Sequence, residues 1–285
     1  MKDRRILLVV HPGRREAIAM AEQIVAHGNS DFAFAVAGEV EIEGTPPLSA
    51  DQKLQGFELC LVFGGDGTIL RAAEVVRGTS IPILGLNLGH VGFLAQLERP
   101  EIKVLIAALK TQKYTVDNRL LLSYAVERHQ QRIHEGFALN EVVIESSNPA
   151  MIELFVQVDG RPLSRWGCDG VLIATPTGST AYAFSAGGPV LWPDVRGMVL
   201  LPLAAHALYS RPMVISPNSS IGIDVESDEA VLSADGLRRI PLISQDRILL
   251  TSAPDEIRLA HMDDSVFTDR LVAKFKLPVD GWRGK

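Results

Sequence analysis

The chain has 285 residues, of which 47% are hydrophobic and 22% charged, and its formal net charge is −6. This profile is typical of a globular protein that is long enough for two domains. The negative charge argues against a general nucleic-acid binder, which would carry a basic face. No apolar run approaches the ~20 residues of a membrane-spanning helix. The two cysteines, Cys60 and Cys168, form neither a metal-binding spacing nor a disulfide framework.

The N-terminal part alternates short apolar runs with helix-compatible segments. Strands are predicted at 5–10, 32–36, 57–63 and 81–87, and helices at 14–27, from 66 to near 78, and at 101–112. This alternation is typical of a parallel, doubly wound α/β sheet. The first apolar run is too short for the core of a signal peptide, so we expect a cytoplasmic protein.

The pattern changes near residue 114, where the apolar runs become shorter and more closely spaced up to about residue 262. That spacing predicts an all-β, sandwich-type domain. Phe267, Leu271 and Phe275 then recur every four residues and predict an amphipathic helix. We therefore expect an α/β domain over 1–113 and a β-sandwich domain over 114–262. A C-terminal segment over 263–285 is expected to pack back on the α/β domain.

The stretch Gly64-Gly65-Asp66-Gly67-Thr68 joins the strand at 57–63 to a helix. Glycine amides at the carboxyl end of such a strand, with the positive end of the following helix, suit a phosphate. Asp66 is unexpected there because a carboxylate repels phosphate, which suggests that it holds a metal or accepts a proton from an attacking hydroxyl. Arg71, one turn later, either faces a ligand or is a solvated helix residue. The alternative for the whole stretch is an ordinary tight turn.

Two stretches in the second half also combine polar groups with apolar surroundings. Asn140-Glu141 interrupts an apolar run, and a buried carboxylate is costly without a partner. Binding of ribose hydroxyls would explain the pair, and so would a solvated strand face with a β-bulge. The stretch from Asp169 to Tyr182 runs from a strand through a hydroxyl-rich turn into a helix. It fits either an anion or sugar site or a helix cap. His206, alone among apolar residues, is more typical of a core histidine than of a ligand.

Several common nucleotide and metal motifs are missing from the sequence. There is no G-x-x-x-x-G-K-[ST] phosphate loop and no G-x-G-x-x-G after the first strand. No His, Cys and Asp residues have the spacing of a tight protein metal site. These absences exclude a P-loop enzyme and a standard dinucleotide-binding domain.

Together these stretches resemble the NAD kinases that use ATP or polyphosphate. The matching residues are Gly64-Gly65-Asp66-Gly67-Thr68, Asn87-Leu88-Gly89 with Gly92-Phe93-Leu94, Asn140-Glu141, Asp169-Gly170 through Thr175 to Pro189, the His206 to Pro212 stretch, and Asp235-Gly236. The glycine motif alone is shared with diacylglycerol and sphingosine kinases and, more loosely, with phosphofructokinases. The other stretches are more specific. Leu237 and Ala205 depart from the family, which often has Gln and Pro at these two positions.

The resemblance implies Mg²⁺-dependent phosphorylation of the 2′-hydroxyl of the adenosine ribose of NAD, giving NADP. ATP, inorganic polyphosphate or both would be the donor, and its phosphates would hold most of the Mg²⁺, with no metal site built by the protein. Asp66 would accept the hydroxyl proton. The phosphate-facing loop would be Gly64, Gly65, Gly67 and Thr68. The NAD contacts would be Asn140, Glu141, Asp169, Thr180, Ala181, Tyr182 and Ser185, with Arg71 as a further contact.

The same resemblance implies a homo-oligomer, a dimer or a tetramer, without nucleic-acid or membrane partners. Two other functions stay open at this point. A lipid kinase of the diacylglycerol class would share the glycine motif and require a lipid-accepting cavity. A non-catalytic sensor would bind NAD or NADP without turnover, although the presence of Asp66 argues against it.

Overall fold

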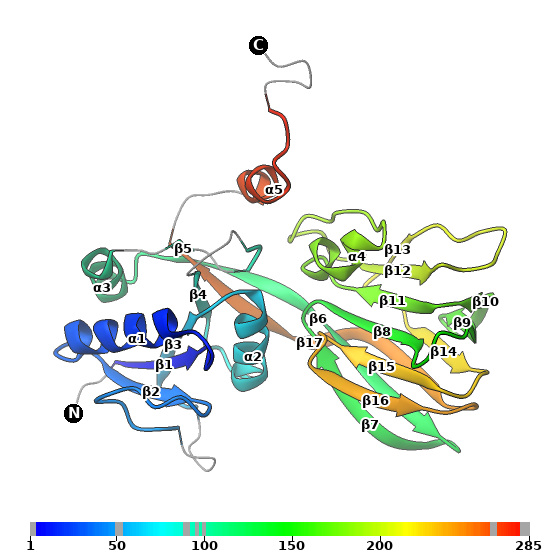
Figure 1. The fold of residues 1–285 in the computed structure, drawn as a ribbon, viewed down its shortest axis with the longest axis horizontal. Coiled ribbons are helices and arrows are strands. Elements are labelled where there is room, and N and C mark those ends of the chain that lie inside the picture. Colours follow the sequence, from blue (N-terminus) through cyan, green and yellow to red (C-terminus); the bar gives the residue numbers. More distant parts are fainter. Residues whose placement is uncertain are drawn as a thin grey trace. The chain divides into compact units, whose positions relative to one another are not determined.

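The computed structural model describes residues 4–48, 54–87, 92–94, 97–98, 101–262 and 267–279. The chain divides into two compact units, whose helices and strands are labelled in Figure 1. The first unit comprises Met1–Asn118 together with Ile257–Lys285, and the second comprises Arg119–Glu256. The first unit is therefore formed by both ends of the chain.

A parallel sheet forms the centre of the first unit. Its strands are β1 (Arg5–Val10), β2 (Ala33–Ala37), β3 (Phe57–Phe63) and β4 (Ile83–Asn87), in the order β2-β1-β3-β4. The short β5 (Leu97–Glu98) and the end of β17 (Arg247–His261) pair with β4, both in parallel. Each strand predicted in this part is confirmed, because long apolar runs are the pattern of strands buried on both faces.

Helices cover both faces of this sheet. They are α1 (Arg15–Gly28), α2 (Asp66–Val76), α3 (Ile102–Thr111) and the C-terminal α5 (Phe267–Phe275). Ile6 and Leu8 of β1 share one apolar cluster with α1 and α3. Leu7 is also buried and points to the opposite face, because side chains alternate along a strand. Helix α2 contacts β1, β3 and β4, and its buried residues lie outside that cluster, so it covers this second face.

Helix α5 confirms the amphipathic pattern predicted for the C-terminal segment. Leu271 is buried. The rings of Phe267 and Phe275 lie with their centroids 6.1 and 5.5 Å from that of Phe93. The end of the chain thus returns to the first unit, as expected.

The second unit consists of antiparallel strands in two sheets. The strands are β6 (Thr115–Arg128), β7 (Gln131–Ala138), β8 (Glu141–Ser146), β9 (Ile152–Val158), β10 (Arg161–Cys168), β11 (Gly170–Ala174), β12 (Met198–Leu203), β13 (Met213–Ile215), β14 (Ile221–Val225), β15 (Ala230–Ala234) and β16 (Arg238–Leu242). One sheet has the order β13-β12-β11-β8-β15-β16. The other contains β10, β9, β14 and β17, with β6 on β17 and β7 on β6.

A single apolar core lies between the two sheets of this unit. It includes Trp166 and Tyr124 from one sheet and Ile144 from the other. The outer face of β11 is also covered, because Ala183 of the short helix α4 (Tyr182–Ser185) packs with Leu172. Burial on both faces explains the unbroken apolar run of this strand. The sandwich-type fold is therefore confirmed.

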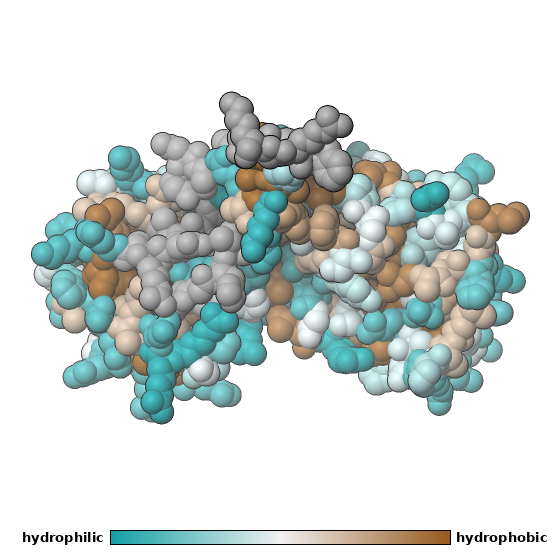
Figure 2. Space-filling view, turned by 45° about the horizontal axis from the view of Figure 1, so that its top comes forward, coloured by the Kyte–Doolittle hydropathy of each residue, from teal (hydrophilic) through white to brown (hydrophobic). Residues whose placement is uncertain are grey.

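The surface mixes polar and apolar side chains. On the face drawn in Figure 2, hydrophilic residues are interspersed with apolar ones. Large apolar side chains that are exposed include Trp192, Leu208 and Tyr209. Among the helices in the described part of the chain, none has the length and apolar character needed to cross a membrane.

Candidate active site

The glycine turn between β3 and α2 contains glycines of two kinds. A Cβ on Gly64 would lie 2.2 Å from Oγ1 of the buried Thr68, so the turn closes only with glycine there. Around Gly65 and Gly67, by contrast, no described atom lies within 4 Å of the place a Cβ would take. An ordinary turn explains the first glycine but not the other two. Their backbones are open to a ligand at the start of an 11-residue helix.

The carboxylate of Asp66 is held by a separate segment of the first unit. Oδ2 accepts the N–H of Phe93 at 3.2 Å, and Oδ1 accepts the N–H of Leu94 at 3.1 Å. A Cβ on Gly92 would lie 2.4 Å from Oδ1, so only glycine leaves room for the carboxylate. Asp66 also occupies the first turn of α2, where a negative charge is favourable. The half-buried carboxylate is thus fixed in position.

The other candidates of this unit are less constrained. Arg71 is exposed on α2. Asn87 is buried at the end of β4, while Leu88 and Gly89 of the family turn lie outside the described residues. Sequence reasoning quoted the Gly92–Leu94 segment for its resemblance but gave it no role. The reason is that backbone amides can donate whatever side chains they carry.

Asp235 organises the Asn140-Glu141 pair in the second unit. Its buried carboxylate accepts the N–H groups of Leu139 at 2.8 Å, Asn140 at 2.7 Å and Glu141 at 3.2 Å. Arg238 lies 3.2 Å from the same carboxylate. Asp235 occupies the turn between β15 and β16 with a φ of 53°, which aspartate tolerates better than most residues. Sequence reasoning quoted Asp235 without assigning it this role.

The hydroxyl-rich loop after β11 packs directly on this pair. Oγ1 of Thr175 donates to the carbonyl of Leu139 at 2.5 Å and accepts the N–H of Gly178 at 3.0 Å. A Cβ on Gly178 would lie 2.0 Å from the carbonyl oxygen of Asn140. The loop therefore fits only with glycine at this position. Its contacts bring the 3-10 turn η1 (Gly178–Thr180) and α4 next to Glu141.

Glu141 is a buried carboxylate with one oxygen to spare. Burial raises its pKa to about 7, the negative charge of Asp235 adds to the rise, and a hydrogen bond from the Tyr182 amide opposes it. Its Oε2 atom is buried and has no hydrogen-bond partner among the described residues. Buried polar atoms are rarely left without a partner. A ligand that donates a hydroxyl group would supply one.

Most hydroxyls of the loop are used within it. Ser179 donates to the carbonyl of Pro176 at 2.6 Å, and Thr180 donates to that of Thr177 at 3.2 Å. Tyr182 and Ser185 are exposed on α4, and Ala181 joins η1 to α4. The helix-cap interpretation thus accounts for the buried hydroxyls, whereas the exposed ones are available to a ligand.

The structure does not bring Asp169 to the Asn140-Glu141 pair. In the pairing of β8 with β11, Ala174 lies opposite Glu141, and Gly170 lies opposite Glu145. Asp169 is thus exposed at the other end of β11, about 17 Å away at the usual rise of a strand. The preference for a core His206 was wrong. Strand β12 ends at Leu203, Ala204 has a φ of 47°, and the histidine that follows is exposed.

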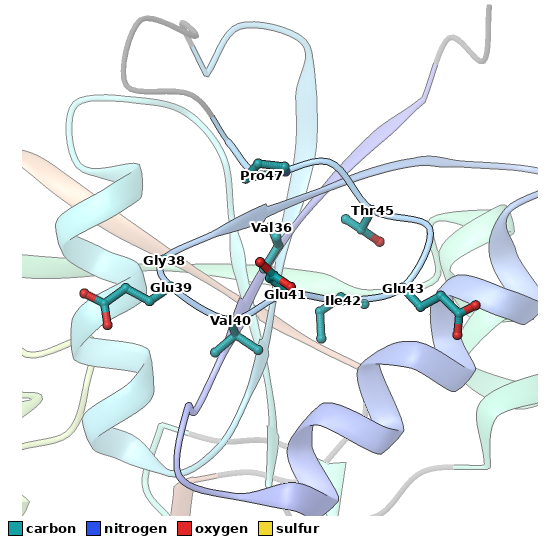
Figure 3. Close-up of a pocket in the computed structure, with 9 residues that line it drawn as sticks. All are labelled: Val36, Gly38, Glu39, Val40, Glu41, Ile42, Glu43, Thr45 and Pro47. Carbon is teal, nitrogen blue, oxygen red and sulfur yellow. The ribbon is translucent and has the colours of Figure 1, made fainter.

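A hollow of about 590 Å³ lies at the loop after β2 in the first unit. It is lined by Val36, Gly38, Glu39, Val40, Glu41, Ile42, Glu43, Thr45 and Pro47. Figure 3 shows the carboxylates of Glu39 and Glu43 pointing to opposite sides, with Glu41 between them. Three carboxylates, with no basic residue among the lining residues, would repel the phosphates of a nucleotide. This hollow is therefore not a plausible phosphate site.

A second hollow of about 550 Å³ lies beside α4 in the second unit. It is lined by Ala186, Gly187, Leu201, Pro202, Leu208, Tyr209, Ser210, Arg211 and Pro212. Arg211 gives it a positive charge, and it includes part of the stretch that resembles the NAD kinases. Its lining suits an anionic ligand better than the acidic hollow does.

Both halves of the chain match family models. Residues 6–114 match the ATP-NAD kinase N-terminal domain, and residues 139–262 match the ATP-NAD kinase C-terminal domain. The chain belongs to the ATP-NAD kinase family. The resemblance drawn from the motifs is thereby confirmed, and with it the assignment of the chain to the kinases.

Individual relatives agree with this membership. An NAD kinase of Leifsonia xyli is 44% identical over 99% of this chain and 97% of its own length. One of Mycobacterium tuberculosis is 43% identical over 99% of both chains. A solved NAD kinase of Archaeoglobus fulgidus in complex with ATP is 27% identical, with a TM-score of 0.71 over 96% of this chain and 98% of its own. Yeast NADH kinase complexed with NADH shares the fold, with 22% identity and a TM-score of 0.88 over 99% of this chain and 90% of its own.

Proposed function

We propose that this protein transfers the terminal phosphoryl group of ATP to the 2′-hydroxyl of the adenosine ribose of NAD, giving NADP and ADP. The observation that carries the proposal is the Asp66 carboxylate. It is fixed by two amide donors inside a turn whose open glycine backbones suit phosphate. Family membership and relatives named NAD kinase support the choice of acceptor.

The glycine turn would bind the donor phosphates. The backbones of Gly65 and Gly67 are open, and the N-terminus of α2 carries a partial positive charge. Gly64 and Thr68 would shape the turn through their close contact, and Arg71 would add a further positive charge. Phosphoryl transfer depends mainly on such positioning and charge stabilisation.

Asp66 would act as the general base. Each carboxylate oxygen has two acceptor positions, so Asp66 can receive the proton of the ribose hydroxyl while the Phe93 and Leu94 amides keep it in place. As the proton moves to Asp66, the freed ribose oxygen forms a bond to the terminal phosphorus. The bond from that phosphorus to the bridging oxygen breaks, and ADP leaves.

The second unit would bind the dinucleotide. The spare Oε2 atom of Glu141 would accept a ribose hydroxyl, and Asn140 beside it would provide an amide. Thr180, Ala181, Tyr182 and Ser185 would contact NAD from the adjoining loop. Asp169, at the far end of β11, would contact a different part of the ligand from Glu141.

Mg²⁺ would enter with the donor phosphates. No group of three or more His, Cys, Asp and Glu side chains suited to a metal is present in the described ranges. This donor set fits an ion that keeps phosphate oxygens and water as its ligands, as Mg²⁺ often does. The bound ion supplies charge neutralisation at the phosphates. Inorganic polyphosphate offers the same oxygens, so it is a second candidate donor.

The resemblance supports two assignments about the protein in the cell. We propose that it works in the cytoplasm and as a homo-oligomer, either a dimer or a tetramer. Light scattering coupled to gel filtration of the purified protein measures its mass directly. A monomer at working concentration would contradict the second assignment.

Product analysis tests the proposed reaction. The purified protein is incubated with Mg²⁺, NAD and either ATP or polyphosphate, and NADP is measured with an NADP-specific dehydrogenase. NADP formation that stops with EDTA and returns with excess Mg²⁺ is the expected result. Phosphorylation of diacylglycerol in place of NAD would indicate the lipid-kinase alternative, and NAD binding without turnover would indicate the sensor. Glu43→Gln, in the acidic hollow, should leave the rate unchanged.

A further inference from the structure

The C-terminal helix contacts the turn that holds Asp66. The ring of Phe93 lies against those of Phe267 and Phe275, with centroids 6.1 and 5.5 Å apart and interplanar angles of 41° and 46°. Such tilted aromatic pairs are favourable beyond their buried area. Phe93 is itself buried. The two ends of α5 therefore fix the side chain of the residue whose amide donates to Asp66.

Arg270, between those two phenylalanines, reaches the backbone of the same turn. Its Nη1 atom donates to the carbonyl oxygen of Phe93 at 3.5 Å, a long hydrogen bond. Its Nη2 atom lies 3.1 Å from Nδ1 of His261. A guanidinium only donates, so Nδ1 is the acceptor and the ring proton sits on Nε2. That Nε2 atom lies 2.9 Å from Oδ2 of Asp117.

One peptide group joins this network to Asp66. The carbonyl of Phe93 and the N–H of Leu94 belong to the same planar unit, and the chain has no cis peptide bond among its described residues. The two groups point in opposite directions, the carbonyl toward Arg270 and the N–H toward Oδ1 of Asp66. The guanidinium thus fixes the plane of this peptide. It also polarises the peptide, which strengthens the N–H as a donor.

We propose that Arg270 is a positioning residue for Asp66, acting through the peptide between Phe93 and Leu94, with α5 as its support. This inference rests on the proposed role of Asp66 as general base. It assigns a catalytic consequence to a helix more than 200 positions further along the sequence. Arg270 does not contact the substrates in this account. Its loss would therefore change turnover more than substrate affinity.

A double-mutant cycle tests the connection between the two residues. Arg270→Ala is expected to lower kcat roughly 10-fold, since small displacements of a catalytic group are costly, and to change KM for NAD and ATP less than about 2-fold. In an Asp66→Asn background the same substitution should cost less than about 2-fold, because the group it positions is already gone. Thr268→Ala, at an exposed position of α5, is the matched control and should have no effect. An equal loss of kcat in both backgrounds would overturn the proposal.

Amide exchange provides a readout that is independent of activity. Selective ¹⁵N labelling of phenylalanine and leucine allows NMR to follow the amides of Phe93 and Leu94. Faster exchange of both is expected in Arg270→Ala and in Phe275→Leu, which removes the ring contact but keeps an apolar side chain. Unchanged exchange in both folded variants would refute the positioning role, even if the protein phosphorylates NAD. Absence of NADP formation by the wild type, with faster exchange in the variants, would instead refute only the proposed function.

Discussion

The two candidate carboxylates differ in what surrounds them. Asp66 is half-buried and accepts two backbone N–H groups, which hold it without occupying all its acceptor positions. Glu141 is buried beside the negative charge of Asp235, and one of its oxygens has no partner among the described residues. The first arrangement suits a group that receives a proton at a fixed place. The second suits a group that waits for a hydroxyl from a ligand.

Glu141 should make the unliganded protein less stable as pH rises. Its pKa is about 7 in the folded protein and 4.5 by reference, which corresponds to ~3 kcal/mol. Between these values the unfolded chain has lost the proton that the folded chain keeps, so the free energy of unfolding falls. Glu141→Gln removes this titration. Its stability relative to the wild type should grow by about 2 kcal/mol between about pH 5 and pH 8, measured by urea unfolding.

A matched carboxylate provides the control for this measurement. Glu153 lies exposed on β9 in the same unit, and Glu153→Gln should follow the wild type across the pH range. If Glu141→Gln also follows the wild type, Glu141 is not the buried acid described here.

At this scale the sequence reveals side chains but not the backbone groups that hold them. Asp66 and the Asn140-Glu141 pair could be predicted because a carboxylate is out of place in an anion-binding turn or an apolar run. The amides of Phe93 and Leu94 could not, because every residue except proline has an N–H group. Asp235 lies 95 positions from Asn140 along the chain, so only the fold brings the two together.

At the scale of elements, the glycine turn is part of a strand-turn-helix unit with little spare space on one side and open space on the other. Gly64 and Gly92 are required by packing, while Gly65 and Gly67 are not. This separation makes the choice between a simple turn and a binding loop open to experiment.

Gly67→Ala should separate stability from activity. The position is exposed in the first turn of α2, and a Cβ there meets no described atom. Alanine should leave the free energy of unfolding unchanged or raise it by up to ~1 kcal/mol, because it favours the helix. Its methyl group should hinder phosphate binding and lower kcat/KM for ATP at least about 10-fold, a loss of ~1.4 kcal/mol in transition-state binding.

A second glycine variant calibrates this result. Gly178→Ala should strongly destabilise the protein, because its Cβ would lie 2.0 Å from the Asn140 carbonyl oxygen. Unchanged kcat/KM in Gly67→Ala, with unchanged stability, would support the simple turn instead.

The turn between β15 and β16 should matter for binding NAD. Asp235→Asn keeps the size and the tolerance for positive φ, but it replaces an acceptor with an NH₂ group facing three N–H donors. Disturbing the Asn140-Glu141 pair should raise KM for NAD roughly 10-fold and lower the free energy of unfolding by about 2 kcal/mol. Steady-state kinetics and urea unfolding measure the two effects.

The chain contains a matched turn for comparison. Asp159 also has a positive φ, of 52°, in the turn between β9 and β10, and it accepts the N–H of Ser220 at 2.8 Å. It is exposed. Asp159→Asn should therefore leave KM for NAD within about 2-fold of the wild type, since its loss is compensated by water. Equal effects of the two substitutions would contradict the role of Asp235.

Elements with a strong apolar pattern could be predicted, and the others could not. The strands of the first unit and helix α5 follow directly from their periodicity. Strands β10 and β16 begin with arginine and carry polar residues on their exposed sides, so their pattern is weak. Helix α4 has only four residues, because the loop before it is held by contacts to the Asn140 backbone rather than by helix propensity.

At the scale of the whole molecule, the order of elements predicts both fold classes. Strands alternating with helices give the parallel sheet, and the later series of short strands gives the sandwich. The return of the C-terminal helix to the first unit follows from its apolar face. Its contact with the Phe93 turn does not follow from the sequence, because it depends on which surface that face covers.

The turnover of Asp66→Asn is the most direct test of this account. Asparagine keeps one oxygen for the amide donors but cannot accept the ribose proton. The variant should fold with wild-type stability, bind NAD and ATP, and form NADP roughly 10²-fold more slowly or worse. The measurement is kcat for NADP formation by purified, folded protein, beside the wild type. NADP formation by both proteins at similar rates would contradict the assignment of Asp66 as the base.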